Sequence, residues 1–309
     1  MDRISTSQSY QSALFNILSA SNRQTEAQNQ VSTGKVADSL TGFGVKSDTL
    51  TGVKAFSARL DSYVSNTQVL STALDVQDQV LGEAATAAQS SRSAVAEAVA
   101  TGNADGLMAA LQGGLSQAVD ALNTQYQGRY IFAGGQTDTQ PVTSVQMSDL
   151  STAPSIASLF KNDQLNTTNR LDDNVVISTG FHADALGTPL FSALKAVQDL
   201  NNGPLGPLSG TLTQAQSDAL TAMLPQFDAA YSNLNESVAT NGVQQSRVAA
   251  VQTSLQDRQT AMTNVMAGLT DVDMAEAVSR LQLSQTALQA SAQVFAALKG
   301  SSLLTALSG

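Results

Sequence analysis

The chain has 309 residues, a net charge of −10 at pH 7, no cysteine, no tryptophan and a single histidine, His182. The acidic balance argues against a nucleic-acid partner, because phosphates require a basic surface, and the lack of cysteine excludes disulfides and thiolate metal sites. No stretch has the roughly 20 apolar residues of a membrane-spanning helix, and the polar start predicts no cleaved signal peptide. Export of this chain would therefore need a signal that is not removed.

Prolines divide the chain into parts that can and cannot form long helices. All but one of the six lie between Pro141 and Pro207, and proline breaks helix interiors. We therefore expect a terminal coiled-coil assembly domain (1–49 with 265–309), a helical middle domain (50–140 with 211–264) and an outward-facing, β-rich insert domain (141–210).

The first predicted helix is the N-terminal end, which carries no charge from Ile4 to Asn22. Its apolar residues recur at helical spacing, and its remaining faces are Ser, Gln, Thr and Ala. Because a solvated surface helix normally has a charged outer face, this end is suited to burial against copies of itself. The alternative is a helix pair docked on its own domain.

A long coiled-coil helix follows. Alternate steps of three and four residues from Val53 to Ala98 meet eleven apolar residues among fourteen positions, as expected of a coiled-coil seam. Thr101-Gly102-Asn103 predicts its end, and a second helix is predicted from Ala104 to Tyr126.

The insert contains strand-like pieces at 130–132 and 175–177, with turn signals at 172–174 and 201–204. Beyond it, the same stepping from Leu220 to Leu269 meets eleven apolar residues among fifteen positions. Two stripes of matching length predict that the two long helices pack together. Pro225 is expected near a helix start or at a kink.

The C-terminal end matches the N-terminal end, because Lys299 is the one charged residue from Leu281 to Gly309. Both ends are amphipathic, and we expect their apolar residues to form an assembly interface. Its candidate residues are Ala13, Leu14, Ile17, Leu18, Val31, Val278, Leu281, Leu288, Ala292, Phe295, Leu298, Leu303 and Leu304.

The sequence offers little that could support catalysis. His182 stands near Asp184, but an exposed loop histidine is the simpler interpretation, and the paired carboxylates at 172–173 and 271–273 are placed for a turn and a helix start. The glycines at 42–44 and 134–135 lack the phosphate-binding patterns, and no metal-ligand cluster is visible. We therefore predict no enzyme, no cofactor and no metal site.

Segments at both ends and in the middle resemble those of one protein family. The run Asp271–Leu281, continued by Gln285–Ser291 and Phe295–Leu304, is similar to the C-terminal signature of bacterial flagellins and flagellar hook-associated proteins. Ile4–Thr6 and Gln30–Lys35 resemble the matching N-terminal signature. Gly128–Pro141 and Asn174–Asp184 resemble the members that join the hook to the filament. The loop Val36–Gly44 departs from the family pattern, which usually has a basic residue and an Asp-Asp pair.

The resemblance implies a mainly α, flagellin-like fold with long paired coiled-coil helices from both chain ends and a small mainly β insert. It also implies a secreted structural subunit of the bacterial flagellum, exported uncleaved with a type III export chaperone. Its partners would be copies of itself, a hook-side junction protein and flagellin. The alternatives are a small flagellin, the bulk filament subunit, and a cytoplasmic coiled-coil adaptor, against which the charge-poor ends argue.

Overall fold

The computed structural model describes residues 2–143 and 145–307, with side chains for 8–143 and 145–299. The chain forms two compact units. We call residues 1–61 with 257–309 the terminal unit, and residues 62–256 the central unit.

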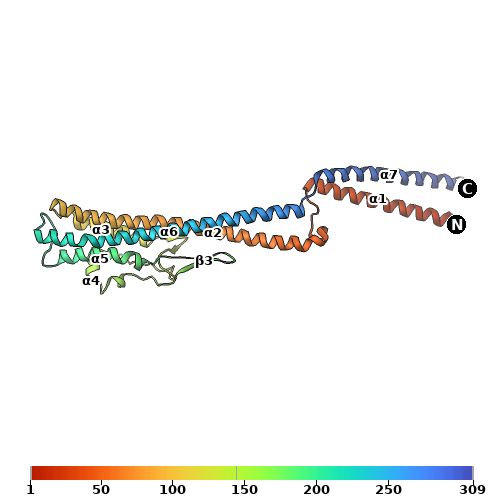
Figure 1. The fold of residues 1–309 in the computed structure, drawn as a ribbon. Coiled ribbons are helices and arrows are strands. Elements are labelled where there is room, and N and C mark those ends of the chain that lie inside the picture. The colour runs from red at the N-terminus through yellow and green to blue at the C-terminus, as the bar shows by residue number, and fades with distance from the viewer. Residues whose placement is uncertain (1, 144, 308–309) are drawn as a thin grey trace. The chain divides into compact units, whose positions relative to one another are not determined.

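Two long helices made from the chain ends build much of the terminal unit. Helix α1 spans Asp2–Thr33 and helix α7 spans Met274–Leu307. They run antiparallel and side by side, with the two chain termini at the same end (Figure 1). The unit also holds the 3-10 helix η1, Leu40–Lys46, with the first turns of α2 (Ser47–Thr101) and the last turns of α6 (Gln214–Thr270).

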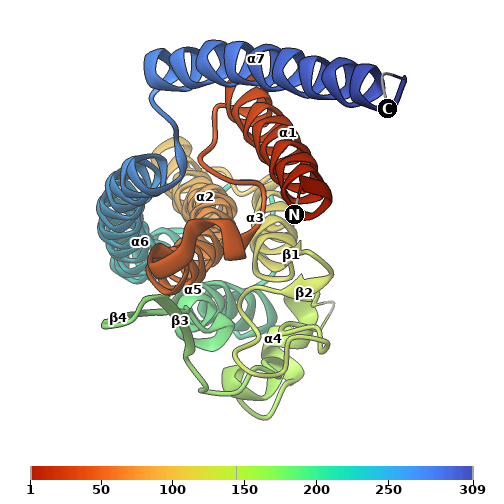
Figure 2. The same cartoon turned by 90° about the vertical axis from the view of Figure 1, so that its right-hand side faces the viewer.

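The central unit is a helical bundle with two small hairpins at its side. Besides α2 and α6 it contains α3 (Leu107–Leu122), α4 (Met147–Thr152), the 3-10 helix η2 (Ile156–Leu159) and α5 (Ala183–Asn202). Strands β1 (Gln125–Tyr126) and β2 (Arg129–Tyr130) form one antiparallel pair, and β3 (Thr167–Asp172) and β4 (Val175–Thr179) form the other. Figure 2 shows the helices almost end on.

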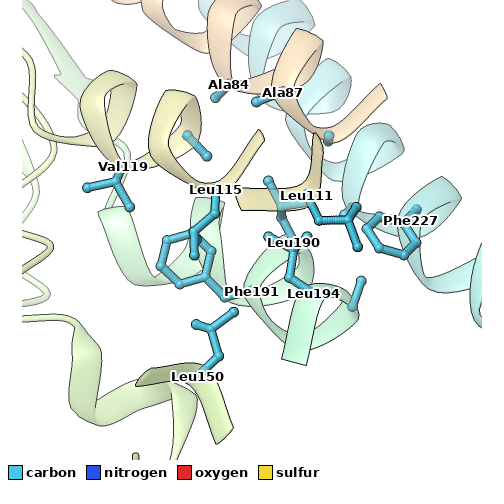
Figure 3. Packing of buried hydrophobic residues seen from close by; sticks show 14 of the residues in the cluster. Ala84, Ala87, Leu111, Leu115, Val119, Leu150, Leu190, Phe191, Leu194 and Phe227 are labelled. Atoms are coloured by element: carbon cyan, nitrogen blue, oxygen red, sulfur yellow. The ribbon is translucent and has the colours of Figure 1, made fainter. Parts of the chain in front are cut away.

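The core of the central unit lies where α2, α3, α5 and α6 meet. Leu111 and Leu115 of α3 face Leu190 and Leu194 of α5, and Phe227 comes in from α6 (Figure 3). All five side chains are fully buried. Burying side chains of this size stabilises a fold by about 1.5–3 kcal/mol each relative to exposure, so this core stabilises the central unit.

The pairing of α2 with α6 is an antiparallel coiled coil that contains amide hydrogen bonds. Gln245 donates to the carboxylate of Asp75 at 3.2 Å, and Gln252, seven residues later, donates to Gln68 at 2.7 Å. Asn241, which is fully buried, donates to the main-chain carbonyl of residue 74 at 3.0 Å. The predicted packing of the two long helices is thus confirmed, and the non-apolar positions of the α6 stripe form cross-helix hydrogen bonds.

The insert differs from the mainly β domain expected between residues 141 and 210. Strands β3 and β4 are present, but α5 alone spans 20 residues. Its apolar residues recur at helical spacing and are buried. Pro189 lies in the second turn, where the helix forgoes one main-chain hydrogen bond. In the sequence, the prolines and turn signals of the same segment mask this stripe. Pro225 likewise lies inside α6, as its twelfth residue.

Candidate assembly surface on the terminal helices

Small residues spaced by seven form the contact between α1 and α7. Ala13, Ala20 and Ala27 of α1 are buried, as are Ala277 and Ser284 of α7. Leu281, Leu288, Phe295 and Leu298 are half-buried beside them. Small side chains let two helix backbones approach closely, and the spacing is that of an antiparallel coiled-coil seam. The two ends of the chain therefore bind each other within one subunit.

A hydrogen-bonded clamp closes the seam at the end farthest from the termini. The N–H of Val36 donates to the carbonyl of Thr270 at 2.7 Å, and the N–H of Val272 donates to the carbonyl of Gly34 at 3.0 Å. The Lys35 ammonium donates to the Asp271 carboxylate at 2.5 Å. This hydrogen bond, with a second from Thr270, lowers the pKa of Asp271 below its ordinary value. The clamp fixes where α1 ends and α7 begins.

An apolar ridge remains exposed on the outside of α1. Leu14 is 50 % exposed, Leu18 is 56 % exposed and Phe15 is 71 % exposed. On α7, Leu283 and Val294 are exposed by 68 % and 56 %. Large apolar side chains gathered on one helix face, as Leu14, Phe15 and Leu18 are, mark an interaction site.

The structure divides the predicted interface residues between two surfaces. Ala13, Ile17, Val31, Leu281, Leu288, Phe295 and Leu298 are buried or half-buried in the terminal unit. Leu14, Leu18, Val278 and Ala292 are exposed. The side chains of Leu303 and Leu304 lie outside the described residues. The predicted interface does not include the exposed residues Phe15, Leu283 and Val294. For Phe15 the sequence does contain a signal, because three consecutive apolar residues at 13–15 are too wide for one seam and indicate a second face.

A shallow groove of about 570 Å³ runs along the pair α1–α7. Its lining is mostly small, and Leu14, Phe15 and Leu18 of the ridge do not contribute to it, whereas the exposed Leu283 of α7 does. Arg23, Glu26 and Arg280 stand around it, and Arg280 also pairs with Glu276 one turn earlier. The small lining residues are Ser19, Ala20, Ala27, Ser284, Ala287 and Ser291. One helix pair thus presents an apolar ridge and a small-residue groove as separate surfaces.

The two middle segments that resemble the junction members lie together in the central unit. The N–H of Ala183 donates to the carbonyl of Phe132 at 3.0 Å, which joins the segment Gly128–Pro141 to the start of α5. The N–H of Gly135 donates to the Asp163 carboxylate at 2.7 Å. This bond, with another from a second N–H at residue 165, lowers the pKa of Asp163.

Glycine is required where this segment meets Asp163. Gly134 has φ +67°, and a Cβ there would lie 2.3 Å from Oδ1 of Asp163. At the hairpin β1–β2, Gln127 and Gly128 both have positive φ, 52° and 77°, as a two-residue type I′ turn requires. The Gly-Gly pair, which lacked a phosphate-binding pattern, is thus a packing feature.

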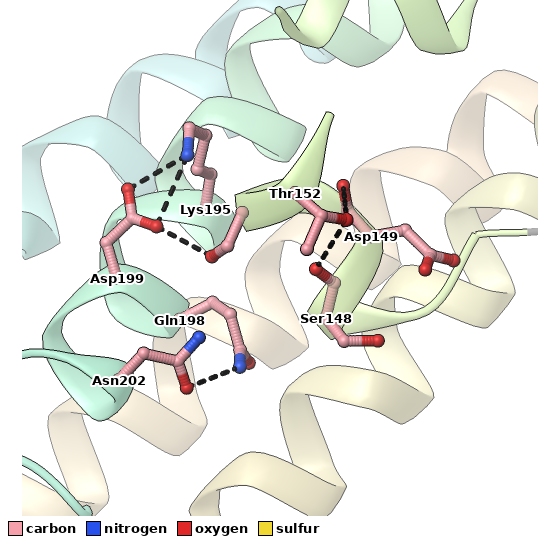
Figure 4. A network of polar contacts seen from close by, with 8 residues as sticks. Ser148, Asp149, Thr152, Lys195, Gln198, Asp199 and Asn202 are labelled. Carbon is pink, nitrogen blue, oxygen red and sulfur yellow. Dashed lines mark hydrogen bonds and ion pairs between the residues drawn. The ribbon is translucent and has the colours of Figure 1, made fainter. Parts of the chain in front are cut away.

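Surface carboxylates elsewhere in the central unit hold elements together. Asp199 of α5 accepts hydrogen bonds from Lys195 at 3.0 Å and from Ser151 of α4 at 2.6 Å (Figure 4). Desolvation by burial raises the pKa of Asp199, but the hydrogen bonds from Ser151 and Lys195 together with the charge of Lys195 outweigh it, so the pKa is lowered. Among the residues with described side chains, no group of three or more His, Asp or Glu is placed to hold a metal ion. No described helix is long and apolar enough to cross a membrane.

Comparison with known proteins identifies the family. Residues 4–137 match the bacterial flagellin N-terminal helical region, and residues 224–307 match the bacterial flagellin C-terminal helical region. The chain belongs to the bacterial flagellin family. The flagellin regions contain α1, α2, α3, α7 and most of α6, whereas α4, α5 and the hairpin β3–β4 lie in the unmatched part between them.

Within the flagellin family, this chain is similar to hook-associated proteins over its whole length. It is 24 % identical to flagellar hook-associated protein 3 of Escherichia coli (strain K12), over 97 % of this chain and 98 % of that protein. A solved structure described as a flagellar hook-associated protein of Vibrio parahaemolyticus matches 74 % of this chain and 100 % of its own, with a TM-score of 0.62 and 16 % identity. Flagellar hook-associated protein 3 of Legionella pneumophila matches 70 % of this chain and 98 % of its own, with a TM-score of 0.57 and 12 % identity.

Proposed function

We propose that this chain is a structural subunit of the bacterial flagellum that joins the hook to the filament, assembling through its terminal helices. The similarity to hook-associated protein 3 over nearly the full length of both chains carries the proposal. The fold agrees with it, because a subunit whose ends pair and expose apolar residues is suited to packing against further copies.

The two surfaces of the pair α1–α7 support a specific contact between copies. The ridge of Leu14, Phe15 and Leu18 on one copy would seat in the small-residue groove of the next. Such a contact is heterologous, so it generates a ring if the rotation closes and a filament if it does not. The hook-side partner and flagellin would then meet the two opposite sides of the ring.

Two further points belong to the same proposal. The subunit would be exported uncleaved through the flagellar type III apparatus with a chaperone, and it would lie outside the cell. A domain formed by residues 1–49 and 265–309 would carry assembly, while the segment 141–210 would face outward.

The deciding experiment is deletion of the gene combined with labelling of the protein. We expect cells without it to build hooks but to release filament subunits into the medium, and label to mark one narrow zone at the hook. Label along the entire filament, or long filaments formed by the purified protein alone, would contradict the junction role. Either result would support the alternative, a small flagellin.

A further inference from the structure

The central unit contains two separate clusters of buried apolar residues. The larger cluster, with 33 buried residues, is the core of the bundle, and no residue of the hairpin β3–β4 belongs to it. The smaller cluster has five buried residues, namely Leu171 and Ile177 of the hairpin with Leu70, Leu74 and Val248 of the helices α2 and α6. The hairpin is therefore docked on the helices through a cluster of its own.

A polar layer lies between the two clusters in the seam of α2 with α6. Gln77 and Asn241 are 7 % and 0 % exposed there. The Asn241 amide donates to the carbonyl of Leu74 at 3.0 Å and to the Asp78 carboxylate at 3.2 Å, so it spans the α2 turn that contains Gln77. The buried members of the larger cluster on α2 begin beyond this turn, at Val80. Because polar side chains separate the two clusters, the smaller one can open without breaking the packing of the larger one.

The base of the hairpin is held by hydrogen bonds that involve neither α2 nor α6. The Asn162 amide donates to Oδ1 of Asp184 at 2.8 Å, and the N–H of Asp184 donates back to the Asn162 side chain at 3.1 Å. Gln164 donates to Oδ2 of the same carboxylate at 2.7 Å. These bonds join the segment before β3 to the start of α5, which follows β4. The hairpin can therefore leave the helices while both of its ends stay in place.

The docking surface of the hairpin is small. Leu171 and Ile177 are 1 % and 2 % exposed, and Val175 is half-buried beside them. Near the tip, the Tyr63 hydroxyl of α2 donates to the Asp173 carboxylate at 2.9 Å. A region with few buried apolar contacts opens at a lower free energy than the core of the same protein. The amide hydrogen bonds between α2 and α6 involve no hairpin residue, so the helices stay paired when it leaves.

From this arrangement we propose that the hairpin β3–β4 is a strap that leaves the seam of α2 and α6 as one unit while the bundle stays folded. In the closed form the helices cover Leu171 and Ile177. In the open form both side chains are exposed, together with the side of the seam that they cover. Opening thus changes the apolar surface that the central unit presents. The proposal goes beyond the proposed junction role and does not involve α1 or α7, so its failure would leave the assembly argument as it stands.

Thiol labelling of the full-length chain tests the strap directly, because the sequence has no cysteine. Leu171→Cys and Ile177→Cys each place a thiol in the smaller cluster. Val197→Cys is the matched control in the larger cluster, where Val197 is 0 % exposed. With iodoacetamide in native buffer, and relative to each variant unfolded in urea, we expect both strap thiols to react at least about tenfold faster than the control. They should also react at equal rates, because the same opening exposes both.

Two further measurements identify the motion. Low concentrations of urea should accelerate the control more steeply than the strap thiols, because global unfolding exposes more surface than release of a hairpin. Tyr63→Phe removes the hydrogen bond at the tip, so it should raise the labelling rate of Ile177→Cys by about two- to tenfold. The same substitution should leave the rate of Val197→Cys unchanged.

Three results would overturn the strap. The first is labelling of both strap thiols at the rate and with the urea dependence of the control, because the hairpin would then leave only when the bundle unfolds. The second is labelling of Leu171→Cys and Ile177→Cys at rates that differ from each other as much as from the control, which would show fraying of one strand. The third is equal acceleration of Ile177→Cys and Val197→Cys by Tyr63→Phe. Circular dichroism verifies that each variant is folded, and Thr179→Cys, at a buried position of β4, replaces a strap variant that is not.

Discussion

The ring of Tyr10 meets the ring of Phe295 edge to face, with centroids 5.1 Å apart and planes inclined by 71°. These residues belong to opposite ends of the chain, and their contact lies toward the tip of the pair α1–α7. Together with the clamp at Lys35 and Asp271, it fixes the register of the two helices at both ends of their seam.

Replacing the two rings should reveal their coupling. An edge-to-face pair contributes about 0.5–1.5 kcal/mol beyond the area it buries. In a double-mutant cycle of Tyr10→Ala and Phe295→Ala, the unfolding free energy of the terminal helices, followed by circular dichroism, should show a coupling of this size. Additive effects of the two substitutions would mean that the rings do not meet in solution.

A charge on the exposed ridge should block assembly without unfolding the protein. Leu18→Asp places a carboxylate on a side chain that is 56 % exposed in the single chain, so the unfolding free energy should change by about 0.5 kcal/mol or less. Sedimentation should nevertheless show loss of assembly, because the carboxylate would be buried between copies. Leu288→Asp, in the seam, should reduce both stability and assembly.

The matched control for Leu18→Asp is Val69→Asp. Val69 is 48 % exposed on α2 in the central unit, so the same kind of change is made away from the ridge. Assembly that survives Leu18→Asp, or that is lost equally with Val69→Asp, would contradict the ridge as the contact between copies.

Removing residues 281–309 should abolish assembly and leave the central bundle folded. The buried core residues of that bundle all lie within the central unit, from Val80 to Leu234. Thermal unfolding of the truncated chain should therefore remain one cooperative transition by circular dichroism. Loss of the transition would show that α7 contributes to the stability of the bundle.

The sequence predicted long helices and their pairing well, because heptad spacing determines both directly. It was less informative where several signals competed. In α5, turn signals and prolines masked a buried helical stripe. At the chain ends, the apolar residues are predicted to form a single interface. In the structure Ala13 is buried against α7, whereas Leu14 beside it is exposed. A single α-helix pattern cannot tell which of two adjacent apolar faces is covered within the chain.

Two glycine substitutions should act in opposite directions. Gly134→Ala should lower the unfolding free energy by about 1–3 kcal/mol, because φ is +67° and the new Cβ would meet Asp163. Gly113→Ala, at an exposed position inside α3 with open space around it, should raise it by about 0.5–1 kcal/mol. Urea unfolding measures both. Equal effects would mean that the close contact between Gly134 and Asp163 is absent.

Acid should weaken the attachment of the Gly134–Gly135 segment through Asp163. Hydrogen bonds from the main chain lower the pKa of this carboxyl in the folded protein. Its contribution to stability is therefore present above the unfolded pKa of about 3.9, and is lost as the pH falls through the lowered folded value. Asp163→Asn should be less stable at pH 7 and show a flatter decline between about pH 5 and pH 2. An unchanged pH profile would contradict the role of these bonds.

Net charge is divided unequally between the two units, and this predicts how assembly responds to salt. The terminal unit has nine basic and nine acidic residues, whereas the central unit has six basic and sixteen acidic residues. Copies joined through neutral terminal helices would bring acidic central units near one another, and these units would repel each other. Salt screens this repulsion, because the Debye length falls from about 10 Å at 0.1 M to 3 Å at 1 M. Raising sodium chloride from about 0.05 M to 0.5 M should therefore lower the protein concentration at which light scattering detects assembly.

A double variant tests whether the acidic residues cause this effect. Asp120 and Asp138 are both exposed in the central unit, and Asp120→Asn with Asp138→Asn should reduce the salt dependence. Assembly that weakens as salt rises would show instead that ion pairs hold the copies together.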